Sequence, residues 1–288
     1  MNAVLECRDL AVAFGGVRAV DGLSFDVHEG EVLSVIGPNG AGKTSAFNCI
    51  TGFYKPTSGS VSFRGADITG GRPANIAAAG IARTFQNLRL FGDLTVLDNV
   101  RAGMHVRLRQ NAFDAILRTP RYRRSEQVAT DESHRWLDFV GVRSDRTTQV
   151  RNLPYGEQRR VEIARALARE PQMLLLDEPA AGLNHGEKEE LLALLRRISD
   201  LGTAVVLIEH DMGLVMEVSQ RIVVISYGKA IAEGTPAQIR TDPAVIEAYL
   251  GAEDAEARSE AEQIAAEQAE ELRAHENRAR SSAQEEGR

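Results

Sequence analysis

Residues 37–44 read Gly37-Pro-Asn-Gly-Ala-Gly-Lys43-Thr44, which matches the pattern G-x-x-x-x-G-K-[ST] in full. An apolar run, Val32–Ile36, precedes this stretch, and a segment of helical character, Thr44–Ile50, follows it. A strand, a glycine-rich turn and a helix in this order open a nucleotide-binding α/β unit. The residues that we predict to bind nucleotide phosphates are Gly37, Pro38, Asn39, Gly40, Ala41, Gly42, Lys43, Thr44 and Ser45.

Each part of this loop has a physical task. Glycines let backbone N–H groups close around phosphate oxygens, Lys43 reaches the β- and γ-phosphates, and the Thr44 hydroxyl binds Mg²⁺. The chain contains only four lysines, so a chance match to the whole pattern is rare. A glycine-rich turn with an incidental lysine is therefore a poor explanation of the motif.

A second motif, Met173-Leu-Leu-Leu-Asp177-Glu178, delivers two carboxylates to the end of an apolar strand. Parallel sheets bind ligands at this end of their strands. We expect Asp177 to hold Mg²⁺, directly or through water, and Glu178 to orient or deprotonate an attacking water. The pattern is weak by itself, because many buried strands end in acids, and strong downstream of a phosphate loop.

The rest of the chain predicts an α/β protein with a helical insertion. The β-rich runs of the N-terminal part are Val4–Val12, Leu23–Val27, Glu31–Ile36 and Ser60–Phe63. Between about 94 and 169 the apolar spacing is helical, over Val96–Arg109 and Ser133–Val140, with a basic connector, Arg118-Thr-Pro-Arg-Tyr-Arg-Arg124, between them. Apolar runs suited to buried parallel strands are Met173–Leu176 and Ala204–Ile208. Ile222–Ser226 predicts a further strand, and Pro236–Leu250 predicts a closing helix.

Composition argues against a membrane-spanning, a secreted or a disulfide-rich protein. The chain is 43% hydrophobic and 26% charged, as globular proteins are, and has no apolar run of 18 residues or more. Its start lacks a signal peptide's basic and apolar segments, so we expect it to stay on the side of the membrane where it is made. Cys7 and Cys49 predict two buried thiols and no disulfide framework.

Most of the net charge of −7 lies in one stretch, 252–288, with eleven acidic and five basic residues. The nearly neutral remainder argues against a dedicated nucleic-acid binder. Ile264 and Leu272 are the only large aliphatic residues of that stretch, too few to form a core. We expect a solvated, partly helical tail, and a partner-binding helix is the alternative.

The stretch Asn152-Leu-Pro-Tyr-Gly156-Glu-Gln-Arg-Arg160 resembles the signature motif of ABC ATPases, which faces the γ-phosphate bound by the opposite subunit. The positions that the resemblance implies for this contact are Leu153, Tyr155, Gly156, Glu157 and Gln158. Likewise, Gln86 stands where the family has its Q-loop glutamine, a metal and catalytic position. His210 follows a strand as the family's switch histidine does. Ala181–Asn184 lies at its D-loop.

Taken alone, a histidine after a strand or a glutamine before a loop means little. Their order around two phosphate-site motifs identifies the chain as a member of the ABC ATPase family. The resemblance implies ATP and Mg²⁺ as ligands, a catalytic set of Lys43, Gln86, Glu178 and His210, and Phe14 as a platform for adenine. It also implies an α/β P-loop NTPase (RecA-like) core with an N-terminal antiparallel β subdomain and a helical signature subdomain at about 94–169, in one domain over 1–251.

Within this family, the chain looks most like the larger ATP-binding subunit of branched-chain amino-acid uptake systems. The stretches that carry the likeness are 83–91, 119–124, 155–165 and 177–184. The implied partners are a second, related ABC ATPase subunit, two polytopic membrane permease subunits and, indirectly, a substrate-binding protein, at the cytoplasmic face of the membrane and with no nucleic acid. Subunits of urea and short-amide importers are closely similar.

Two departures and three alternatives stay open at this point. Pro154 and Tyr155 replace the Ser and Gly usual in the signature, which removes a hydroxyl donor to the partner's ATP. Asn184 stands where many relatives have an aspartate, which replaces a charged contact between subunits by a neutral amide. The alternatives to a transporter motor are a soluble ABC ATPase acting on nucleic acid or ribosomes, a non-ABC kinase or GTPase, and a binding module without turnover.

Overall fold

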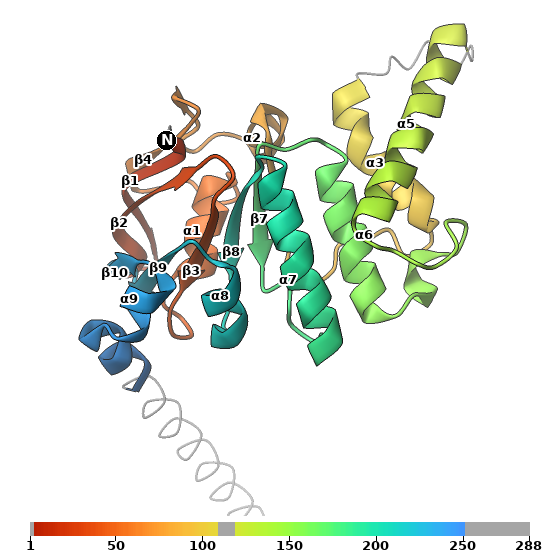
Figure 1. The fold of residues 1–288 in the computed structure, drawn as a ribbon. Coiled ribbons are helices and arrows are strands. Elements are labelled where there is room, and N and C mark those ends of the chain that lie inside the picture. The colour runs from red at the N-terminus through yellow and green to blue at the C-terminus, as the bar shows by residue number, and fades with distance from the viewer. Residues whose placement is uncertain (1–2, 109–118, 251–288) are drawn as a thin grey trace, which may run out of the picture.

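A computed structural model describes residues 3–108 and 119–250 (Figure 1). At its centre lies a six-stranded sheet with the order β10-β9-β3-β8-β7-β6. Its strands are β3 (Val32–Ile36), β6 (Ile81–Arg83), β7 (Met173–Asp177), β8 (Ala204–Ile208), β9 (Arg221–Ser226) and β10 (Lys229–Gly234). All neighbours pair in parallel except β10, which is antiparallel to β9. The apolar runs predicted as buried parallel strands are confirmed, whereas β6 and β10 were not predicted.

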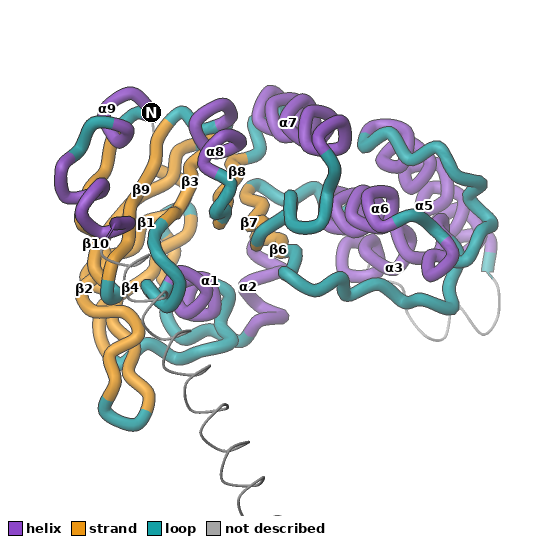
Figure 2. Tube along the Cα trace, turned by 90° about the horizontal axis from the view of Figure 1, so that it is seen from below, coloured by secondary structure: helices purple, strands orange, loops and turns teal. Residues whose placement is uncertain are grey.

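Alternate residues of these strands face opposite cores, as the two-residue period of a strand requires. On one face Leu174, Leu176, Val205 and Leu207 pack with α7 (His185–Asp200) and α8 (Met212–Val218). On the other face Leu33, Val35, Leu175 and Val206 pack with α1 (Lys43–Ile50). Figure 2 shows the sheet between these two helical layers, with α2 (Pro73–Ala79) on the side of α1.

A second sheet, antiparallel, has the order β2-β1-β4-β5 and closes over α1. It is built from β1 (Ala3–Phe14), β2 (Val17–His28), β4 (Ser58–Phe63) and β5 (Ala66–Asp67). The inward residues Leu5, Leu23 and Val61 are almost fully buried and share a core with Phe47 of α1. Cys7 and Cys49 are free and buried in that core, as predicted.

The helical insertion stands to one side of the sheet in both views (Figures 1 and 2). It comprises α3 (Val96–Leu108), α5 (Pro120–Phe139), the 3₁₀ turn η1 (Val150–Asn152) and α6 (Tyr155–Leu167). The prediction of a non-helical basic connector over 118–124 was wrong from Pro120 onward, because α5 begins at that residue. Proline fits the first turn of a helix because its missing N–H has no partner there, and the Thr119 side chain accepts a hydrogen bond from the Tyr122 amide as N-cap. Residues 109–118 lie outside the described residues.

The closing helix predicted over Pro236–Leu250 is two helices. The first, α9, covers Pro236–Arg240, and helical structure resumes over 243–250. Pro243 disfavours a helical conformation at Asp242, the residue before it. The Asp242 carboxylate then accepts the amides of Ala244 and Val245, which caps the second helix.

The predicted α/β architecture, a core sheet with an N-terminal antiparallel sheet and a helical insertion, is confirmed. Over residues 3–108 and 119–250, no helix is both long and apolar enough to cross a bilayer. The tail expected over 252–288 lies outside the described residues.

Candidate nucleotide-binding site

The phosphate loop joins β3 to α1 and is shaped by glycines. Gly37 and Gly42 have φ of 151° and 102°, in the region that favours glycine. A Cβ at Gly37 would lie 1.9 Å from the Ile225 oxygen, and one at Gly42 would lie 2.1 Å from the Ala19 oxygen. Helix α1 has no side-chain cap and no acidic residue in its first turn. Its first amides are thus left for an anion.

Lys43 closes over its own loop. Its Nζ donates to the backbone oxygens of Gly37 at 2.6 Å and Pro38 at 2.9 Å. Burial lowers the pKa of Lys43, and the carboxylates of Glu178 and Asp177 oppose that shift. The ammonium therefore lies between the loop and the acidic end of β7, where its charge can reach a phosphate held by the loop.

The order of the sheet explains how distant residues meet. Strands β3, β8, β7 and β6 are parallel neighbours, so the segments that follow them emerge at one edge. The phosphate loop follows β3, and His210 follows β8. Asp177 ends β7 with Glu178 directly after it, and Gln86 follows β6. The structure brings together these residues, which were predicted from separate motifs.

Asp177 is 4% exposed and forms an ion pair with Arg83, whose Nη2 lies 2.9 Å from Oδ2. Arg83 also donates to Asn48 Oδ1 and Thr51 Oγ1 of α1 and its C-cap. This arginine links the acidic strand to the helix behind the phosphate loop. Arg83 begins the stretch 83–91 that carries the family likeness, but it was not predicted as a site residue.

Glu178 occupies a left-handed backbone conformation, with φ of 49°, which is uncommon for a residue with a side chain. Its amide donates to the Ile208 oxygen, and its Oε2 accepts a 2.8 Å hydrogen bond from Nε2 of Gln86. Nδ1 of His210 lies 3.9 Å from the same carboxylate. Three predicted catalytic residues therefore form one cluster.

Glu209 is a buried residue beside this cluster that the sequence reasoning did not single out. It is 1% exposed, and its carboxylate accepts hydrogen bonds from the amides of Ala180, at 2.7 Å, and His210. Burial raises the pKa of Glu209. The side chain ties the segment after Glu178 to the segment that carries His210. An acidic residue directly after an apolar strand was the available signal.

The signature segment lies apart from the phosphate loop, at the start of α6 in the helical insertion (Figure 2). Gly156 is buried against α7, where a Cβ would meet Oε1 of Glu187 at 2.2 Å. Tyr155 is exposed, and its hydroxyl accepts a hydrogen bond from Arg159. Asn184 caps α7 in a reciprocal capping box with Glu187. The amide at this departure from the family pattern thus has a local structural task.

The remaining signature positions are held within the insertion. Leu153 is buried, and its backbone oxygen accepts a hydrogen bond from Nε2 of Gln158. Oε2 of Glu157, in the first turn of α6, accepts the Ser144 amide at 3.2 Å. These contacts leave Tyr155 as the large side chain that the start of the helix exposes.

Phe14 ends β1 with 45% of its surface exposed, and its ring packs edge to face on Tyr54 with centroids 4.9 Å apart. The two rings come from segments on either side of the phosphate loop in the sequence. Tyr54 was not predicted. An exposed, supported aromatic ring is suited to stacking on a base.

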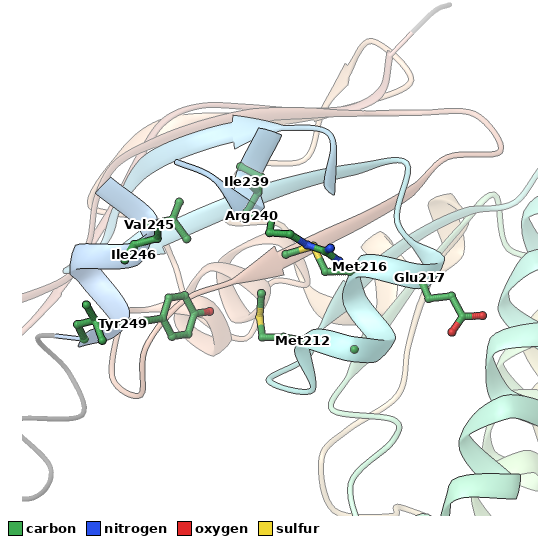
Figure 3. A pocket seen from close by; sticks show the side chains of 10 residues that line it. Met212, Met216, Glu217, Ile239, Arg240, Val245, Ile246 and Tyr249 are labelled. Carbon is green, nitrogen blue, oxygen red and sulfur yellow. The ribbon is translucent and has the colours of Figure 1, made fainter. Parts of the chain in front are cut away.

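A cavity of about 620 Å³ lies between α8 and the C-terminal helices (Figure 3). Its walls are mainly aliphatic and thioether side chains, among them Met212, Met216 and Ile239, with the ring of Tyr249 beside them. Burial raises the pKa of the Tyr249 phenol. None of the predicted site residues lines this cavity.

A phosphate loop, an acidic strand end, a glutamine and a histidine at one sheet edge, with a signature helix held at a distance, define an ATP-binding cassette. Comparison with known proteins agrees. The ABC transporter family model matches residues 20–181, and the model of the branched-chain amino acid ATP-binding cassette transporter matches residues 231–255. The chain belongs to the ABC transporter family of ATP-binding proteins, in its branched-chain amino acid transport group.

Individual relatives extend this match. The high-affinity branched-chain amino acid transport ATP-binding protein LivG of Salmonella typhimurium is 46% identical over 249 residues, covering 86% of this chain and 98% of its own. BraF of Pseudomonas aeruginosa, named for the same transport, is 47% identical over the same shares. A crystal structure of the ADP conformation of MJ1267, an ATP-binding cassette of an ABC transporter, aligns with a TM-score of 0.76 and 30% identity, over 87% of this chain and 100% of that one. The resemblance predicted from the motifs is confirmed.

Proposed function

We propose that this chain hydrolyses ATP as a motor subunit of an importer for branched-chain amino acids. The observation that carries the hydrolytic part is the contact of Glu178 with Gln86 at the edge where Lys43 and the phosphate loop lie. The names of relatives 45–47% identical over nearly their whole length support the substrate. A binding module without turnover would have no need of a carboxylate held at this point.

In the proposed reaction, the loop amides and Lys43 bind the triphosphate. Glu178 orients the attacking water and accepts its proton, since its side chain is 23% exposed and lies at the carboxyl edge of the sheet. His210 stabilises the charge that develops on the γ-phosphate. Phosphoryl transfer of this kind depends mainly on positioning and charge stabilisation. A site whose side chains are already held by hydrogen bonds to one another suits this requirement.

The chain's residues also fit a divalent cation. Asp177 offers a buried carboxylate, with the Thr44 hydroxyl and the Gln86 amide oxygen from neighbouring segments of the same edge, and hard cations prefer such oxygen ligands. When bound, Mg²⁺ would neutralise charge on the β- and γ-phosphates. The present partner of Asp177 is a cation, Arg83, so this position already stabilises positive charge.

The separation of the signature from the phosphate loop supports a head-to-tail dimer. One chain supplies the loop and its partner the signature, so a second ABC ATPase subunit is required to complete each site. We propose a related, non-identical subunit, two polytopic permease subunits and a substrate-binding protein as the other components. The chain would then act as a peripheral subunit at the cytoplasmic face of the membrane.

Purification of the tagged chain from its native membranes tests this proposal, with ATPase assays on the reconstituted complex. We expect a second cassette subunit and two polytopic proteins to co-purify. Leucine, isoleucine and valine, added with the binding protein, should stimulate hydrolysis, whereas urea and acetamide should not. Recovery without membrane proteins, or stimulation by urea alone, would contradict the transport function or its substrate.

A further inference from the structure

Arg159 is a cation in the second turn of α6 with only 1% of its surface exposed. Its guanidinium donates hydrogen bonds of 2.9 Å to the backbone oxygens of Phe85 and Gln86, to Oε2 of Glu162 and to the hydroxyl of Tyr155. The first two acceptors lie in the segment after β6, and the last lies in the signature. One buried side chain therefore contacts both functional segments.

The contacts continue to the catalytic carboxylate. Gln86, whose backbone oxygen is held by Arg159, donates from Nε2 to Oε2 of Glu178 at 2.8 Å. Glu162, the ion-pair partner of Arg159, accepts the Arg89 amide through its other oxygen. The segment from Phe85 to Arg89 is thus attached to α6 on both sides of Gln86.

Stability alone does not explain this arrangement. Two charges removed from water lose hydration that their attraction only partly returns, and an apolar pair of similar volume is often as stable. Burial raises the pKa of Glu162, which reflects this cost. The planar guanidinium, in contrast, fixes the directions of several acceptors at once. Its contribution is therefore to geometry.

We propose that Arg159 is a positioning residue that couples the signature helix to the catalytic carboxylate through Gln86. The exposed Tyr155 and neighbouring Gly156 would meet the nucleotide held by the partner subunit. Arg159 transmits the orientation of this helix start to the backbone of Gln86, and Gln86 transmits it to Glu178. The two ATP sites of the dimer would then communicate through this chain. This inference rests on the proposed ATP hydrolysis.

The test compares ATP hydrolysis by the reconstituted complex with wild-type chain, Arg159→Met and Arg159→Met/Glu162→Leu. The double variant replaces the buried ion pair by apolar side chains and leaves no unpaired charge. We expect kcat to fall by about 10- to 100-fold in both, because small misplacements of catalytic groups have effects of this size. KM for ATP should change by less than about twofold, because the phosphate loop is untouched.

A double-mutant cycle separates positioning from a merely structural effect. In a Gln86→Ala background, Arg159→Met should lower kcat by no more than about twofold further, because the route to Glu178 is already broken. Arg135→Met is the control: this exposed arginine of α5 pairs with Glu132, away from the segment of Phe85 to Arg89, and its loss should keep wild-type kcat.

Other outcomes have distinct meanings. Equal kcat in wild type and in a folded Arg159→Met/Glu162→Leu complex would overturn the inference. It would also be overturned if kcat of the Arg159→Met/Gln86→Ala variant fell by the product of the two single-variant reductions. Absence of hydrolysis in the wild-type complex would instead contradict the proposed function. Thermal unfolding of each variant, measured in parallel, identifies any protein that has lost its fold.

Discussion

Arg83 Nη2 lies 2.9 Å from Oδ2 of Asp177, and the two side chains are 6% and 5% exposed. The guanidinium is also surrounded by aromatic rings, with the Phe85 centroid 5.0 Å from its central carbon. The carboxylate expected to hold a metal ion is thus paired with a protein cation. Because both are buried, loss of one partner leaves an uncompensated charge, which is far more costly than loss of a surface pair.

The first prediction concerns this pair. Arg83→Leu should lower the free energy of unfolding by about 3–5 kcal/mol in the absence of divalent cations. Millimolar Mg²⁺ should then raise the melting temperature of the variant more than that of wild type, since a cation bound only by the folded state adds stability by mass action. Thermal unfolding with and without Mg²⁺ measures both effects.

Two controls accompany this experiment. Arg196→Leu removes one partner of an exposed ion pair with Glu217 and should cost no more than about 1 kcal/mol. Asp177→Asn in the Arg83→Leu background should abolish the response to Mg²⁺. An equal Mg²⁺ response in wild type and in Arg83→Leu would show that the arginine does not neutralise the cation position.

The second prediction concerns the base. Glu178→Gln should keep ATP binding but lower turnover by about 10²–10⁴-fold, the range that a positioned general base contributes. The amide can still contact Gln86, so the fold of the site should persist. Phosphate release measures turnover, and size-exclusion chromatography with ATP should show an accumulated closed dimer. Glu189→Gln, an exposed change on α7, serves as the control, and unchanged turnover in Glu178→Gln would exclude Glu178 as the base.

The third prediction is a pH dependence. The pKa of Glu209 is raised by burial, so the folded state favours the protonated carboxyl, and its stabilising contribution is lost as pH rises through the folded pKa. Glu209→Gln cannot ionise. The free energy of unfolding of this variant should therefore rise relative to that of wild type as pH rises above 4.5, the ordinary pKa of a glutamate side chain. Urea unfolding at several pH values measures this difference, and a constant difference would contradict the prediction.

The fourth prediction concerns the C-terminal helices. Val245 is 5% exposed and packs in one cluster with Ile36, the last residue before the phosphate loop. A chain ending at Gly251 keeps these contacts and should match wild type in stability and ATPase activity. A chain ending at Asp242 should lose about 2–5 kcal/mol, the usual cost of removing large buried side chains. Urea midpoints compare the two truncations, and equal loss in both would show that 252–288 stabilises the fold.

The sequence allowed prediction of features whose cause is local. The glycines at 37 and 42 stand where a Cβ would collide with backbone oxygens. The short apolar run before Asp177 and Glu178 predicted a buried strand, and all five residues of β7 are buried. The two prolines at 120 and 243 were interpreted wrongly. Pro120 was predicted in a connector but begins a helix, and Pro243 was predicted inside one helix but separates two. A proline marks either the first turn of a helix or a break, and the capping contacts of Thr119 and Asp242 decide which.

Apart from Tyr54, the missed residues are charged side chains whose role depends on distant partners. Arg83 meets Asp177 across 94 positions, and Arg159 meets Phe85 across 74. In the sequence these arginines are indistinguishable from those on the surface, because only the topology determines which are buried. Glu209 differs, since it directly follows an apolar strand.

The last prediction concerns the adenine platform. Phe14 is supported edge to face by Tyr54, so its free face can stack on a base. Phe14→Ala should weaken ATP binding by about 1–3 kcal/mol, the range measured for base–aromatic stacking, and Phe14→Trp should retain it. Inorganic triphosphate, which has no base, should bind Phe14→Ala and wild type with equal affinity. Lys43→Ala should weaken the binding of both ATP and inorganic triphosphate. Tyr227→Ala, at a ring that is 91% exposed, is the matched control. Competition titrations with a fluorescent nucleotide give all of these affinities. Weaker triphosphate binding in Phe14→Ala would mean that the substitution disturbs the phosphate loop, and unchanged ATP binding would remove Phe14 from the site.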